Sequence, residues 1–119
     1  MSVAATVVVA LIALIHVYIA IFEMFLWEQR GPKVFSSFDR DLFPKTVALA
    51  QNQGIYNAFL AAGLIWSLFI STDDWQRNVA VAFLLMVAVA GVVGALTAER
   101  RIAFVQTVPA VIGLVLVLI

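Results

Sequence analysis

The sequence predicts an all-α fold, a bundle of four transmembrane helices that forms one integral membrane domain over residues 1–119. Of the 119 residues, 65% are hydrophobic and only 12% are charged, whereas soluble domains are about half apolar and about a quarter charged. Four apolar segments have about the 20 residues that a helix needs to cross a bilayer. Their polarity does not alternate, which favours helices over barrel strands as the spanning elements.

The first predicted helix, residues 3–27, carries His16 and Glu23 inside its apolar run. At about 100° per residue, the seven-residue spacing returns these two side chains to nearly the same helical face. A charge at hydrocarbon depth costs roughly 2.5 kcal/mol or more, so such a group usually faces protein or a water-filled cavity and has a function. We therefore predict that His16 and Glu23 are catalytic acid–base or hydrogen-bonding groups.

The first connection, residues 28–46, has helical periodicity of its own. Its regularly spaced apolar residues, between Pro32 and Pro44, are Val34, Phe35, Phe38 and Leu42. This pattern predicts a short interfacial helix on the inner leaflet. It is either a connector that follows the membrane surface or a lid over a polar pocket.

The remaining predicted helices cover residues 47–70, 78–98 and 102–119, with connections at 71–77 and 99–101. Six of the seven basic residues lie in the first and third connections, and only Arg77 lies in the second. Positively charged loops remain cytoplasmic. We therefore expect a multi-pass protein of the cell membrane with its N-terminus and C-terminus both external.

Polar side chains concentrate in the cytoplasmic half of the predicted bundle. The expected ligand-binding residues there are Asn52, Gln53, Tyr56, Asn57, Gln106 and Arg100. The alternative is structural, because amides often join membrane helices at about 0.6 kcal/mol per contact. In that interpretation His16 bonds Asn57 or a backbone carbonyl, and Glu23 is neutral and hydrogen-bonded to Gln53 or Tyr56.

Several chemistries are excluded by residue counts. The chain has no cysteine and one histidine, so we expect no metal site, no disulfide and no thiol chemistry. No phosphate-binding glycine loop or serine nucleophile elbow is present. Acidic residues balance the basic ones of the first connection, which argues against nucleic-acid binding. The sequence defines no cofactor.

Four motifs are similar to those of a known family. They are His16-Val17-Tyr18, Glu23-Met24-Phe25-Leu26-Trp27, the segment from Asn52 to Leu64, and Phe104-Val105-Gln106 with Pro109. Together they resemble a family of small four-helix integral membrane proteins catalogued as domain of unknown function 1304. The resemblance covers nearly the whole chain and implies that these polar positions form one constellation, but it implies no activity.

A looser resemblance is to the membrane-associated proteins of eicosanoid and glutathione metabolism. Those are four-helix chains with a glutamine shortly before a proline in the last helix, as Gln106 and Pro109 stand here. The resemblance implies trimers with cytoplasm-facing sites between subunits. This chain departs from the pattern at residues 48–51, where it lacks their basic residues.

Three functions follow from these expectations. The first is binding or modification of a small amphipathic or lipid-like molecule in the cytoplasmic leaflet, by a homodimer or homotrimer in contact with membrane lipid. The second is a non-catalytic accessory subunit of a larger membrane complex. The third is a proton-coupled exporter that resembles the small multidrug transporters.

Overall fold

The computed structural model describes residues 1–119 and contains helices and connections without any strand. The elements are α1 (Val3–Phe25), α2 (Trp27–Val34), α3 (Leu42–Lys45), α4 (Val47–Phe69), α5 (Asp73–Thr97), the π-helix η1 (Ala103–Thr107) and α6 (Val108–Leu118). The predicted all-α class is confirmed. The chain forms two compact units, which we call the apolar unit (Met1–Leu14 with Leu60–Ile119) and the polar unit (Ile15–Phe59).

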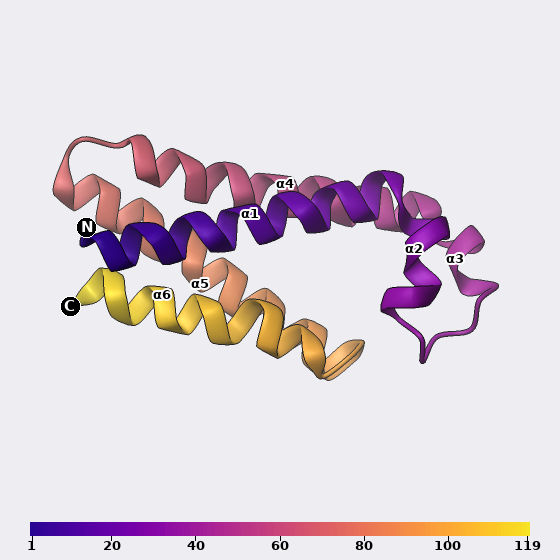
Figure 1. Ribbon diagram of the computed structural model, residues 1–119. Coiled ribbons are helices and arrows are strands. Elements are labelled where there is room, and N and C mark those ends of the chain that lie inside the picture. The colour runs from indigo at the N-terminus through magenta and orange to yellow at the C-terminus, as the bar shows by residue number, and fades with distance from the viewer. The chain divides into compact units, whose positions relative to one another are not determined.

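The apolar unit is built around a continuous hydrophobic core. Its buried residues come from the start of α1, the end of α4, and from α5 and α6: Ala5, Val9, Ile12, Ala13, Leu64, Ala80, Leu84, Val87, Ala110 and Val117. In Figure 1, α6 runs beside α5 in the opposite direction. In water, burial of apolar side chains stabilises this unit by about 25 cal/mol per Å². Dispersion contacts between closely packed side chains stabilise it in water and in lipid alike.

A glycine allows α5 to approach η1 closely. A Cβ atom added at Gly91 would lie 2.7 Å from the backbone nitrogen of Thr107, which is closer than real Cβ contacts come. At the same crossing, the Thr107 hydroxyl donates a hydrogen bond of 3.0 Å to the carbonyl oxygen of Ala88. The absence of a side chain at Gly91 therefore permits this crossing.

The polar unit is joined by aromatic side chains around α2 and α3, which lie beside each other in Figure 1. The ring centroid of Trp27 is 5.6 Å from that of Phe22 and 5.1 Å from that of Phe43. Phe43 is fully buried and lies directly against Gly31, where an added Cβ would overlap its ring. The Trp27 Nε1 group donates a 2.9 Å hydrogen bond to the Thr46 hydroxyl.

The predicted helices 3–27 and 47–70 agree closely with α1 and α4, but the predicted helix 78–98 begins too late. The structure starts α5 at Asp73, five residues earlier. Thr72 has the extended backbone of an N-cap, and Asp73 and Asp74 occupy the first turn, where carboxylates interact favourably with the helix dipole. The apolar run marks only the apolar part of this helix.

The predicted interfacial helix of the first connection is displaced. Two short helices flank residues 35–41 instead, and each contains one of the prolines taken as boundaries. Pro44 lies in the first turn of α3, where a missing N–H costs nothing. Pro32 lies inside α2, and the aromatic contacts of Trp27 hold that helix in place.

The predicted helix 102–119 is not uniform. Residues Ala103–Thr107 form a π-turn in which the Val108 N–H bonds the carbonyl of Ala103. Pro109 follows at the start of α6 and has no N–H to offer the carbonyl four residues before it. The missing donor accounts for the wider winding at this point.

Two helices, α1 and α5, are long and apolar enough to cross a membrane, judged by length and composition. The segment Ala103–Leu118 is apolar but shorter. Helix α4 is as long as α1, but the amides of its first half lower its hydropathy.

Candidate functional site

The centre of the candidate site is a contact between α1 and α4 within the polar unit. Asn57 Nδ2 donates a hydrogen bond of 2.5 Å to Glu23 Oε1. The same nitrogen donates a second bond, of 3.2 Å, to the backbone carbonyl oxygen of Gln53. Both Glu23 and Asn57 are half-buried. The structure thus pairs a carboxylate with an amide that is itself anchored to its own helix.

Gly54 makes this pairing possible. A Cβ atom at position 54 would lie 3.1 Å from the carbonyl oxygen of Ala20 and 3.2 Å from the backbone nitrogen of Met24. These are backbone atoms of α1, and the Met24 side chain would lie closer still, so the two helices approach each other closely at this point. Asn57 is one turn after Gly54 and therefore reaches Glu23 across the same face.

His16 is the second predicted catalytic residue, and the structure buries it completely. It lies on α1, two turns before Glu23, and Ala20 between them is also buried. The stripe His16–Ala20–Glu23 is therefore the inward face of α1 in the polar unit.

Three of the predicted ligand-binding residues lie elsewhere on α4. Asn52, Gln53 and Tyr56 are exposed, and the Tyr56 ring packs edge-on against Phe59 with a centroid distance of 6.0 Å. Asn52 and Tyr56 point away from the direction of Asn57, because each residue turns the helix by about 100°, whereas Gln53 lies on nearly the same face one turn earlier. The hydrogen-bonding partner of Glu23 is Asn57, and not Gln53 or Tyr56.

The last two predicted residues belong to the apolar unit. Gln106 is buried within η1, and Arg100 is exposed in the connection that precedes it. Beside Arg100, Arg101 and Glu99 form an ion pair of 2.8 Å.

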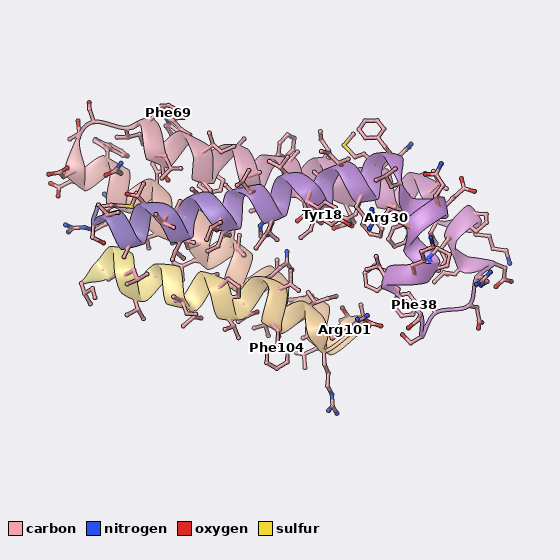
Figure 2. All side chains as sticks on the ribbon, viewed as in Figure 1. Tyr18, Arg30, Phe38, Phe69, Arg101 and Phe104 are labelled. Atoms are coloured by element: carbon pink, nitrogen blue, oxygen red, sulfur yellow. The ribbon has the colours of Figure 1, made fainter.

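Two side-chain contacts of the polar unit were not expected from the sequence. The guanidinium carbon of Arg30 lies 5.9 Å from the centre of the Tyr18 ring, and Figure 2 labels both side chains. Thr46 accepts the indole hydrogen bond of Trp27. In neither contact do the two residues belong to the same helix. The spacing of residues along one helix therefore does not predict these pairs.

A surface depression of about 450 Å³ lies at the turn between α2 and α3, and neither Glu23 nor Asn57 lines it. It is lined by Ser37, Phe38, Asp39, Asp41, Leu42 and Lys45. Lys45 and Asp41 there form an exposed ion pair of 3.5 Å. No group of three or more His, Cys, Asp or Glu side chains gathers anywhere in the structure that could hold a metal ion.

Comparison with known proteins gives a family without an assigned activity. The chain is 30% identical over 107 residues to the uncharacterised protein YpaA of Lactococcus lactis subsp. lactis (strain IL1403), and the match covers 88% of both chains. No solved structure matches this chain. Residues 10–118, which include the Glu23–Asn57 contact, match the family described as "Protein of unknown function (DUF1304)", and the chain therefore belongs to that family.

Proposed function

We propose that this protein is a multi-pass protein of the cell membrane that binds a small amphipathic or lipid-like molecule at the Glu23–Asn57 contact. The observation that carries the proposal is the hydrogen bond between these two half-buried side chains on adjoining helices. Polar groups at such depth face protein, water or a ligand.

Exposed apolar surface supports the membrane part of the proposal. In the most apolar stretches of α1 and α5, only 39% and 28% of the residues are buried inside the protein. A helix in the core of a soluble protein would be mostly buried. Figure 2 shows Phe69 and Phe104 pointing away from the ribbon, and they are 82% and 72% exposed. Lipid would cover these side chains without cost, whereas water would not.

In the proposed topology, α4 and the Ala103–Leu118 segment also span the bilayer, which gives four spans. Helix α4 has 23 residues, about 35 Å of helix, and the shorter last segment would be matched by local thinning of the bilayer. Four basic residues lie between α1 and α4: Arg30, Lys33, Arg40 and Lys45. Their charge supports a cytoplasmic position for that connection, which in the proposed topology leaves both termini outside.

Single cysteines test this topology directly, because the chain contains none of its own. We expect Ser37→Cys, between α2 and α3, to react with an impermeant thiol reagent only after the cytoplasmic face is opened. Ser71→Cys, between α4 and α5, should react in intact cells. Labelling of both positions from the same side would overturn the four-span topology.

The ligand-binding part rests on access to the carboxylate. Glu23 is half-buried, so a molecule within the leaflet would reach it. His16 is fully buried on the same face of α1, so it would affect the ligand through neighbouring side chains rather than by direct contact. The exposed residues Asn52, Gln53 and Tyr56 would contact the polar end of the ligand or a second copy of the chain. A homodimer or homotrimer would enclose these residues. Gln106 and Arg100, which belong to the apolar unit, stay separate predictions of ligand contact.

Native mass spectrometry of protein released from membrane patches without detergent tests the binding. We expect the wild type to retain an amphipathic molecule that Glu23→Gln loses, because this variant removes the charge with little change in shape. Glu28→Gln, which removes an exposed carboxylate from α2, is the matched control and should retain the molecule. Equal retention by all three proteins would refute the proposed site.

The same measurement tests the accessory-subunit function, and a flux measurement tests the exporter function. The exposed apolar faces would also suit an accessory subunit, and a stoichiometric larger membrane protein would then leave the membrane with this chain. The carboxylate on the first helix would suit a proton-coupled exporter. That function requires substrate flux in proteoliposomes under a proton gradient, lost in Glu23→Gln.

A further inference from the structure

The hydrogen bonds at Asn57 leave the site with acceptors only. An asparagine side chain has two N–H donors, and here both are used, one on Glu23 Oε1 and one on the Gln53 carbonyl. What remains at the contact is oxygen: Glu23 Oε2 and Asn57 Oδ1. An arrangement of acceptors is complementary to a donor, and it repels an anion.

The carboxylate of Glu23 also has no cationic partner. The basic side chains of the polar unit are engaged elsewhere or exposed: Arg30 lies over the Tyr18 ring, Lys45 pairs with Asp41, and Lys33 and Arg40 are exposed. Glu23 forms no ion pair, and its hydrogen bond comes from a neutral amide. A carboxylate in an apolar helix is costly unless a positive charge or a proton neutralises it.

Aromatic rings in this unit offer further interactions with a cation. One ring of this unit, that of Tyr18, already lies beneath a positive charge, the guanidinium of Arg30. Tyr56, which lies one residue before Asn57 in sequence and is turned about 100° from it, forms an exposed edge-on pair with Phe59. Aromatic faces attract ammonium groups within about 6 Å of the ring centre.

From these observations we propose that the amphipathic molecule bound at the Glu23–Asn57 contact carries a protonated amine, which donates its N–H groups to Glu23 Oε2 and Asn57 Oδ1. This inference rests on the proposed function and names the chemical class of its ligand. The ammonium supplies both features missing from the contact, the positive charge and the donors. The apolar part of the molecule lies in the leaflet.

Three probes with the same dodecyl chain test the inference: dodecylamine, which is protonated at neutral pH, dodecanol and dodecyl sulfate. Each is added to the protein in lipid nanodiscs, and bound probe is counted by native mass spectrometry. We expect dodecylamine to bind about tenfold or more tightly than the other two, because a charge-assisted hydrogen bond is lost with each of them. Glu23→Gln should abolish that preference, and Glu28→Gln should preserve it.

The outcomes separate this inference from the function on which it rests. In one outcome, dodecanol or dodecyl sulfate binds as tightly as dodecylamine and its binding still depends on Glu23. That result would overturn the inference that the ligand carries an amine and leave the proposed binding site in place. Binding of all three probes without any dependence on Glu23 would overturn both. Asn57→Leu is a second variant that keeps the carboxylate. It should weaken dodecylamine binding and retain the order of the three probes.

Discussion

The two units satisfy their polar groups in different ways. In the apolar unit, the Ser67 and Thr107 hydroxyls bond backbone carbonyls, those of Leu64 and Ala88. The ion pair of Arg101 with Glu99 lies in a connection, outside the named helices of this unit. In the polar unit, side chains bond side chains, as in the pairs Glu23–Asn57 and Trp27–Thr46. A hydroxyl bonded to the backbone offers little to a ligand, whereas a side-chain pair can exchange partners. The helices of the apolar unit are therefore specified mainly by shape, and those of the polar unit by side-chain pairs, one of which is the contact that we propose as the ligand site.

The largest loss of stability is expected where a new side chain would meet backbone atoms. In Gly91→Ala the new Cβ would meet backbone and Cβ atoms of η1, so helices must move apart and stability should fall by about 3 kcal/mol. In Gly113→Ala the nearest atoms are the flexible ends of Leu84, at 3.1 and 3.3 Å. There the loss should stay below about 1 kcal/mol, since alanine is also the better helix former.

Unfolding of both variants in mixed micelles, followed by circular dichroism during titration with sodium dodecyl sulfate, measures this difference. The two glycines lie in the same unit, so the comparison holds the surroundings of the core nearly constant. Equal losses for Gly91→Ala and Gly113→Ala would show that backbone contact at η1 does not specify the apolar unit.

A smaller effect on stability, with a change in binding, is expected from Gly54→Ala. Its Cβ would press on Ala20 and Met24, so α1 and α4 separate by a few tenths of an ångström and stability falls by about 1 to 2 kcal/mol. Asn57 moves with α4, so the protein should also retain less of the proposed ligand, whose retention depends on Glu23. Native mass spectrometry and the same unfolding titration measure the two effects.

Gly63→Ala is the control on the same helix. Its Cβ would overlap the Phe83 ring in the apolar unit, so it should lower stability at least as much. Ligand retention, corrected for the folded fraction, should stay that of the wild type. If Gly63→Ala reduced retention as strongly as Gly54→Ala, binding would follow overall stability rather than the contact between α1 and α4.

The sequence located the polar residues better than it paired them. The ends of α1 and α4 were predictable because their apolar runs stop where the helices stop. The start of α5 was not, because Asp73 and Asp74 belong to a helix without belonging to an apolar run. Nor was η1, since Pro109 acts on the turn before it rather than on its own position.

The pairing of Glu23 was missed for a physical reason. Depth in a membrane follows from the rise of about 1.5 Å per residue, and depth alone made Gln53 or Tyr56 the expected partner of the carboxylate. Rotation about the helix turns Tyr56 away from the face of Asn57, while Gln53 lies on nearly that face one turn earlier, and the rotation is set by where the backbones touch. Gly54, with buried Ala50 one turn before and Ala61 two turns after it, marks that face of α4, and this spacing of small residues was a usable signal.

The smallest effect is expected from Thr46→Val, which removes the acceptor of the Trp27 indole hydrogen bond. Trp27 is half-buried, so water can replace part of the lost bond, and the expected cost is about 1 kcal/mol. Thr97→Val is the control, because the Thr97 hydroxyl bonds only Val93 in its own helix. With Trp66 and Trp75 changed to phenylalanine, the emission of Trp27 reports the change directly. Thr46→Ser should restore the emission because it keeps the hydroxyl. Equal shifts in Thr46→Val and Thr97→Val would mean that side-chain pairs do not set the polar unit apart.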